Sequence, residues 1–110
     1  MVEYQNPRLD SVFASLGHPV RRSILEQLRL GTLRVTELAA PFDLSLAAVS
    51  KHIGVLEDAR LLHRTIVGRE HRIALAASEL LPARQWLETY REFWEAGLDR
   101  LEASLGVRQV

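Results

Sequence analysis

Side chains that donate hydrogen bonds gather in two short stretches of the 110-residue chain. The first stretch holds a hydroxyl, an ammonium and an imidazole among small residues, in the order Ala47, Ala48, Ser50, Lys51, His52 and Gly54. The second, residues 60–72, holds four arginines opposed only by Glu70, namely Arg60, Arg64, Arg69 and Arg72. Small residues let a backbone approach a large partner closely, and these donors suit base edges and phosphates. The pattern therefore predicts nucleic-acid binding chemistry.

Catalytic and metal-binding patterns are missing from the sequence. The chain has no cysteine, which excludes disulfides, thiolate metal sites and a cysteine nucleophile. It has no glycine-rich phosphate loop and no Ser/His/Asp order, and its acidic residues are scattered. A metal site built from His52, His63 and His71 is the alternative, with His18 elsewhere, but we favour surface or DNA-facing histidines. We expect no enzyme activity, no cofactor and no metal.

Composition and charge indicate one globular domain over residues 1–110. Hydrophobic residues make up 47% of the chain and charged residues 25%, with a formal net charge of zero. Residues 1–75 carry 10 basic and 8 acidic side chains, whereas residues 76–110 carry 4 and 6. Neutrality thus conceals a basic segment followed by an acidic one. No apolar run reaches the ~20 residues of a membrane span, and residues 1–5 do not read as a signal peptide, so we expect no membrane association.

Hydrophobic periodicity predicts helices over most of the first 60 residues. Leu9, Val12, Phe13 and Leu16 have helical spacing, and a second helix runs from Pro19 to about Leu30. A short extended piece at residues 33–35 precedes a brief helix that opens at Arg34 or Thr36 and is limited by Pro41. Ser45 is a good N-cap for a helix from Leu46 to about Ala59.

The period changes to two over residues 61–75, which predicts a β-hairpin with its turn at Gly68 and Arg69. A long final helix, residues 78–105, is then expected, with Ser78 as its cap and Pro82 in an early turn. Leu80, Leu87, Trp94 and Leu101 recur at spacings of seven along it, with Ala83, Tyr90, Leu98 and Leu105 between them.

This regular stripe has two interpretations, packing on the chain's own core or a homodimer seam. We favour a seam shared with the first helix, residues 8–17, since the stripe is longer than the remaining short helices require. The expected interface residues are Leu9, Val12, Phe13, Leu87, Tyr90, Trp94, Leu98 and Leu101. A ligand pocket lined by Trp86, Tyr90, Phe93 and Trp94 is the alternative to simple packing of these aromatics.

The order of these elements predicts a winged helix-turn-helix fold, mainly α with a small β-hairpin, in the order α-α-α-α-β-β-α. Two helices joined by a tight turn form the helix-turn-helix, and the hairpin behind them is the wing. The DNA-reading segment covers about residues 35–75. The expected DNA contacts are Ser45, Ala47, Ala48, Ser50, Lys51, His52, Arg64, Arg69 and Arg72.

Three segments resemble the ArsR-type winged-helix transcriptional regulators. These are LGHPVRRSILEQL, ELAAPFDLSLAAVSKHIGVLEDARLL and GREHRIAL, and the resemblance covers nearly the whole chain. The segment WLETYREFWEAGLDRLEASL is similar to the ends of cysteine-poor members. The resemblance implies a cytoplasmic homodimer that binds an inverted repeat in double-stranded DNA and usually represses.

The chain departs from that family's pattern at several positions. Arg60 stands where glycine usually follows the recognition helix, so that helix end must be capped differently or strained. Gly54 replaces a frequent basic residue, and Ile73 replaces a frequent wing tyrosine. Relatives that sense metals use short-helix cysteines or Asp/His pairs on the last helix. Here residues 38–40 are Leu-Ala-Ala and the last helix has no histidine, which implies a subgroup that does not sense metals.

Three function classes follow from these observations. The leading hypothesis is a homodimeric DNA-binding repressor, whose effector, a small molecule or a protein, the sequence does not identify. The second is a winged-helix module that binds proteins and not DNA, against which the basic hairpin counts. The third, an enzyme or small-molecule carrier, lacks a polar anchor in the sequence.

Overall fold

The computed structural model describes residues 6–106, and the chain divides into two compact units, Met1–Leu80 (unit 1) and Leu81–Val110 (unit 2). The expectation about a signal peptide falls on residues 1–5, outside the described residues. No helix within residues 6–106 combines the length and apolar character needed to cross a bilayer.

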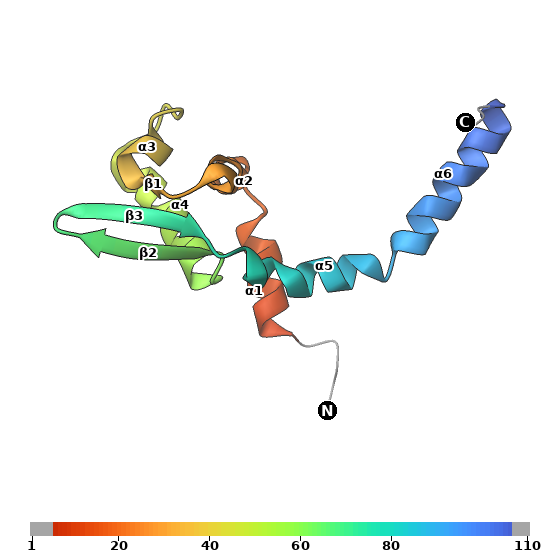
Figure 1. Cartoon of the computed structure of the whole chain (residues 1–110), viewed down its shortest axis with the longest axis horizontal. Helices are drawn as coiled ribbons and strands as arrows, with labels where there is room; N and C mark the ends of the chain where they lie inside the picture. Colours follow the sequence, from red (N-terminus) through yellow and green to blue (C-terminus); the bar gives the residue numbers. More distant parts are fainter. Residues whose placement is uncertain (1–5, 107–110) are drawn as a thin grey trace. The chain divides into compact units, whose positions relative to one another are not determined.

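Short helices make up most of unit 1 (Figure 1). Their bounds are α1 Pro7–Ser15, α2 Pro19–Gln27, the 3₁₀ helix η1 Leu28–Leu30, α3 Val35–Ala39, α4 Leu46–Asp58 and the 3₁₀ helix η2 Ala77–Leu80. Side chains at their starts accept backbone N–H groups that lack helical partners. Asn6 Oδ1 accepts from Leu9 at 3.1 Å, and His18 Nδ1 accepts from Val20 at 3.1 Å. Each local start signal therefore fixes where a helix begins.

A three-stranded antiparallel sheet completes unit 1. Strands β1 (Leu33–Arg34), β2 (Leu62–Val67) and β3 (Glu70–Leu75) lie in the order β1-β3-β2. The predicted hairpin is confirmed, with Leu62 opposite Leu75 and Val67 opposite Glu70. The expected two-strand count was wrong, because the extended piece at Leu33 pairs with Ile73 across 40 residues of sequence, which local periodicity does not show.

Apolar side chains from all the main elements of unit 1 form one core. Its fully buried members are Ile24, Leu38, Val49, Ile53, Leu56, Leu61 and Ile73. Ile73, which replaces the frequent wing tyrosine, fills the core from the middle of β3. The helix-turn-helix and the hairpin therefore rest on a shared hydrophobic base, which fixes the position of the surfaces above it.

The end of α4 carries backbone strain at Arg60. The Leu61 N–H donates to the Leu56 carbonyl at 2.9 Å, and the Arg60 N–H donates to the Glu57 carbonyl at 2.8 Å, the two bonds of a Schellman motif. Arg60 occupies the left-handed position of that motif, with φ of 63°. Of the two expectations for this helix end, a different cap or strain, the structure shows the second, since the usual motif forms with arginine in a conformation that favours glycine.

Within residues 81–106, unit 2 contains two helices, α5 (Leu81–Glu88) and α6 (Arg91–Leu105). The prediction of one helix over residues 78–105 was therefore wrong, as was Ser78 as its cap, since Ser78 lies inside η2. The Thr89 and Tyr90 N–H groups donate to carbonyls three residues back, at 3.2 and 3.0 Å. The Thr89 hydroxyl also donates to the Trp86 carbonyl at 2.7 Å. This local competition for carbonyls ends the α-helical ladder.

Candidate nucleic-acid interface

Helices α3 and α4, joined by residues 40–45, form the predicted helix-turn-helix. Ser45 Oγ accepts from the Ala48 N–H at 3.1 Å, which confirms Ser45 as the N-cap of α4. Past this cap, Ala47 and Lys51 are exposed, while Ala48 and Ser50 are half-buried. The start of α4 thus presents small and donor side chains on a surface that a double helix can approach.

The β2–β3 hairpin extends beyond the helices of unit 1 as the predicted wing (Figure 1). Its two-residue turn consists of Gly68, with φ of 64°, and Arg69. A positive φ at the first turn position suits the twist of a hairpin and requires little energy from glycine. Arg69 is exposed at the tip and takes part in no ion pair among the described residues.

A groove of about 400 Å³ lies between α3, α4 and the wing. Its lining residues are Arg34, Val35, Thr36, Leu46, Ser50, Arg64, Arg69, Glu70 and His71. The groove brings together Ser50 on α4 and Arg69 at the wing tip, two predicted DNA contacts from distant parts of the sequence. Leu46, an apolar residue of the α4 pattern, is half exposed and lines the same groove.

Arg64 connects the wing to α4. Its Nη2 and Nε donate to the two oxygens of Glu57 at 2.7 and 3.0 Å, and its Nη1 donates to His71 Nδ1 at 2.8 Å. The hydrogen bonds to Glu57 raise the pKa of Arg64 above its ordinary value. A bidentate, half-buried pair of this kind fixes the angle between β2 and α4. A DNA contact by Arg64 stays a prediction, and its guanidinium already has partners.

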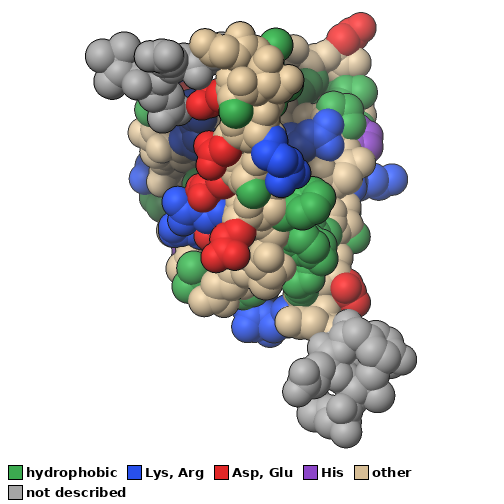
Figure 2. Space-filling model, turned by 90° about the vertical axis from the view of Figure 1, so that its right-hand side faces the viewer, with side chains coloured by type: hydrophobic (Ala, Val, Ile, Leu, Met, Phe, Trp, Pro, Cys, Tyr) green, Lys and Arg blue, Asp and Glu red, His purple; other side chains and the backbone are tan. Residues whose placement is uncertain are grey.

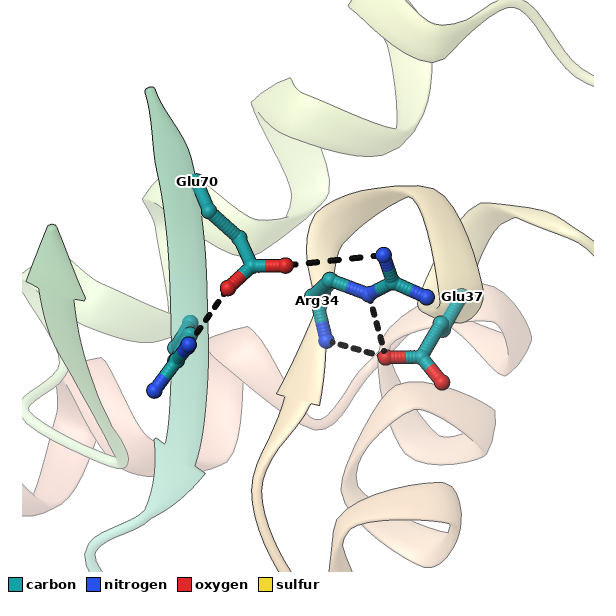
Figure 3. Close-up of polar contacts among 4 residues, drawn as sticks. Arg34, Glu37 and Glu70 are labelled. Carbon is teal, nitrogen blue, oxygen red and sulfur yellow. Dashed lines mark hydrogen bonds and ion pairs between the residues drawn. The ribbon is translucent and has the colours of Figure 1, made fainter. Parts of the chain in front are cut away.

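Four charged residues form an ionic cluster beside the groove, which we call the Arg34–Glu70 cluster: Arg34, Glu37, Glu70 and Arg72. Figure 3 shows Arg34 between Glu37 and Glu70. Glu37 Oε1 accepts from the backbone N–H and from Nε of Arg34, both at 3.0 Å. The backbone hydrogen bond lowers the pKa of Glu37, and the hydrogen bond to Glu37 raises the pKa of Arg34. The bond from the Arg34 N–H to Glu37 is one half of a capping box, and it places Arg34, not Thr36, at the N-cap of α3.

His52 faces α2, which differs from the outward direction that the sequence predicts for it. Its ring lies 4.3 Å from the ring of His18, and Arg21 Nη1 lies 3.2 Å from its Nδ1. Arg21 also donates to the carbonyls of Ser15 and Ala14 at the end of α1. Burial, with His18 and Arg21 as further causes, lowers the pKa of His52. His52, as a neutral acceptor, therefore connects α4 to α2.

The remaining histidines do not gather into a metal site. His63 is exposed on β2, and His71 binds Arg64. Within residues 6–106, no group of three His, Cys, Asp or Glu side chains is placed to hold a metal ion.

The predicted dimer residues fall into two groups. In α1, Val12 is buried and Leu9 and Phe13 are half-buried. In unit 2, Leu87, Tyr90, Trp94, Leu98 and Leu101 are all exposed. Figure 2 shows hydrophobic side chains grouped on one face, next to a row of acidic side chains. On α6, Trp94, Leu98, Leu101 and Leu105 follow the spacing of one helix face, which we call the α6 stripe.

Sequence reasoning missed the residues whose partners belong to other elements of the fold. The Glu57–Arg64 and Arg34–Glu70 pairs join different elements, and no local pattern indicates them. The N-cap at Arg34 was detectable from the sequence, since Glu37 lies three residues after it and a glutamate there can accept the N–H of the N-cap. Arg21, which joins α1, α2 and α4, gave no signal beyond its charge.

Comparisons with known proteins agree with this geometry. A family model described as a helix-turn-helix domain matches residues 16–65. The chain is 35% identical over 98 residues to the HTH-type transcriptional regulator Rv2034 of Mycobacterium tuberculosis, covering 89% of this chain and 87% of that protein. It is 25% identical over 79 residues to the transcriptional repressor SdpR of Bacillus subtilis, covering 72% and 88%.

A solved structure agrees as well. The crystal structure of the ArsR family transcriptional regulator RHA00566 has a TM-score of 0.75 and 36% identity, covering 83% of this chain and 95% of that one. The chain therefore belongs to the ArsR family of helix-turn-helix transcriptional regulators. The predicted family and winged fold are confirmed, and the groove beside α4 belongs to a DNA-binding protein.

Proposed function

We propose that the chain is a cytoplasmic, sequence-specific repressor without enzyme activity, and that it binds an inverted-repeat operator as a homodimer. In this proposal α4 enters the major groove, where Ser50 and Lys51 contact bases and phosphates. Arg69 reaches the backbone or the adjacent minor groove from the wing tip. A repressor role is also supported by the similarity to SdpR, whose name describes a transcriptional repressor.

One observation carries the proposal most directly, the groove that joins Ser50 on α4 to Arg69 on the wing. Both elements rest on the same buried core, which includes Ile53 and Ile73. Because of this base, the two sets of donors keep a fixed separation before DNA arrives. Pre-organised donors lose less conformational entropy on binding than donors on independent loops.

The homodimer is supported by the α6 stripe. Trp94 is 50% exposed, Leu98 59% and Leu105 68%. Exposed apolar side chains at regular helical spacing mark a surface that another helix covers. A second copy presents the same stripe, so a two-fold axis pairs the stripes. Such a dimer matches the symmetry of an inverted repeat.

A salt titration of DNA binding tests the proposal. Lys51→Ala and Arg69→Ala are each compared with the wild type on one duplex, by fluorescence anisotropy. Each lost phosphate contact reduces the slope of log affinity against log salt by about 0.9. We expect both variants to bind more weakly and to show the shallower slope.

The matched control is Arg29→Ala, which removes one exposed charge from η1, outside the lining of the groove. It should keep the slope of the wild type. If binding does not weaken as salt rises, or if all three variants behave alike, the proposed contact surface is wrong. Retained binding to a protein partner, with no DNA binding, would then favour the protein-interaction module.

A further inference from the structure

The carboxylate of Glu70 holds two arginines at once. Arg34 Nη1 lies 3.5 Å from its Oε1, and Arg72 Nε lies 2.7 Å from its Oε2. Arg34, drawn beside Glu70 in Figure 3, belongs to β1. Arg72 belongs to β3, the strand that pairs with β1. One carboxylate therefore neutralises much of the positive charge that these two strands present.

This carboxylate also stands at the candidate interface. Arg34 and Glu70 line the groove that contains Ser50 and Arg69. The same two residues line a second hollow of about 540 Å³, which Arg72 and Thr65 border as well. Arg34 and Glu70 thus belong to both hollows, the groove beside α4 and its neighbour.

Both arginines are free to change partner. The side chain of Arg34 is 52% exposed and that of Arg72 is 48% exposed. Ion pairs at this exposure contribute little to stability, since water screens them. A guanidinium binds phosphate in a planar, bidentate geometry that a DNA backbone supplies. Exchange of the Glu70 carboxylate for a phosphate therefore has a small energetic cost.

Because of Glu37, the exchange of partners affects only the side chains and not the start of α3. It accepts the backbone N–H of Arg34 as well as its Nε, so it holds the start of α3 independently of Glu70. Release of Glu70 by the Arg34 side chain leaves the helix-turn-helix in place.

We propose that Arg34 and Arg72 are sequence-independent contacts to DNA phosphates, and that Glu70 is their intramolecular competitor. Glu70 in this role lowers the affinity of the surface for every duplex and makes its salt dependence shallower. The inference rests on the proposed DNA-binding function and adds a contact, Arg34, together with a residue that limits affinity through other residues.

The test measures binding of the full chain to a short duplex of random sequence, from about 50 to about 300 mM salt. Glu70→Gln keeps the shape and hydrogen-bonding capacity of the side chain but removes its charge. We expect it to bind about threefold to tenfold more tightly at about 0.1 M salt, with a slope steeper by about one contact. Glu70→Asp keeps the charge and should restore the wild-type slope.

Two further variants separate this role from a general charge effect. Adding Arg34→Ala and Arg72→Ala to Glu70→Gln should abolish the gain in affinity. Glu26→Gln removes an exposed carboxylate of α2 that lines neither hollow, and it should leave the slope unchanged.

Three results would overturn the inference. The first is an unchanged slope for Glu70→Gln while wild-type binding stays salt-dependent, including the case in which only the melting temperature falls. The second is an equal gain for Glu26→Gln. The third is wild-type binding that ignores salt, which would overturn the proposed function as well. The first two results leave that function standing.

Discussion

The two units of the chain differ in how they use their apolar side chains. In unit 1, Ile24, Leu38 and Ile53 are completely buried. In unit 2, Phe93, Leu98 and Leu105 are each more than half exposed, and α6 has no buried residue. Unit 1 thus contains its own hydrophobic core, whereas α6 gains little stability from burial in the chain as it stands. The exposed apolar face of α6 is the surface that the proposed dimer would cover.

The two units also differ in where their charged side chains lie. Unit 1 carries the groove with Arg34, Arg64 and Arg69. In unit 2, Arg91 of α6 pairs with Glu95 of the same helix and with Glu88, the last residue of α5. The Arg91–Glu95 pair has the i,i+4 spacing that stabilises a helix, and the Arg91–Glu88 pair spans the short break between α5 and α6. In the proposed function, attraction of DNA phosphates is therefore concentrated at the groove, and the zero net charge of the chain does not oppose it.

The largest expected effect follows from truncating the α6 stripe. Trp94→Ala removes a large aromatic from both halves of a two-fold interface, and a buried tryptophan of this kind contributes about 2 kcal/mol or more. Two copies give about 4 kcal/mol, so the dimer dissociation constant should rise about 10³-fold. Analytical ultracentrifugation measures this change.

Phe93→Ala is the matched control, because Phe93 is a neighbouring exposed aromatic outside the stripe. It should leave the dimer intact. A Trp94→Ala variant that remains dimeric at low micromolar concentration would contradict the assignment of the stripe to the dimer.

A second pair of truncations compares the cores directly. Ile53→Ala opens a cavity in unit 1 and should cost about 2–4 kcal/mol of unfolding free energy at every protein concentration. Leu98→Ala should lower stability in a concentration-dependent way, because in the proposed dimer its partner is a second chain. Urea denaturation at several protein concentrations distinguishes the two. If both losses are independent of concentration, the contrast between the units is wrong.

The third effect concerns pH and the contact of His52 with α2. Burial lowers the pKa of His52 in the folded chain, so folding favours its neutral form. The stability from this form is complete above the unfolded pKa near 6.5 and is lost as pH falls through it toward the lower folded-state pKa. Both neighbours that face His52, His18 and Arg21, oppose a positive charge there.

We therefore expect the unfolding free energy to fall from pH 7.5 to 5.5, and the difference between wild type and His52→Ala to shrink. Chemical denaturation at the two pH values measures both quantities. DNA affinity at the two pH values is a second readout. If His52 were freely exposed, its imidazolium would form at low pH and strengthen binding to phosphate. If the difference in unfolding free energy between the wild type and His52→Ala is larger at pH 5.5 than at pH 7.5, this interpretation is wrong.

The smallest effect is at the end of α4. Arg60→Gly relieves a left-handed conformation, and the unfolding free energy should rise by about 1 kcal/mol. Arg60→Ala removes the charge but keeps a Cβ in that conformation, so it should not reproduce the gain. Thermal denaturation of the two variants compares them, and equal effects would assign the change to charge and not to strain.

Local signals predicted the frame of unit 1 well. The hydroxyl of Ser45 and the positive φ available to Gly68 act on their immediate neighbours, so the cap and the turn were readable from the sequence. The Leu33–Ile73 pairing and the Arg34–Glu70 contact depend on residues more than 30 positions apart, and no periodicity encodes them.

In unit 2, a local pattern predicted one continuous helix where the structure has two. A spacing of seven residues continues through Thr89 and Tyr90, where the backbone leaves the α-helix. The spacing of apolar residues shows which side chains share a helix face only as long as the helix is continuous. The stripe was therefore predicted correctly within α6, but its extension back to Leu80 on one helix was not.

Selection and sequencing of duplexes bound by the purified chain tests the central claim most directly, namely that α4 and the wing read DNA in a two-fold dimer. The account predicts an enriched inverted repeat whose half-site centres lie about 10 base pairs apart, or a multiple of that distance. Enrichment of no sequence, or of a single asymmetric site without a repeat, would contradict it.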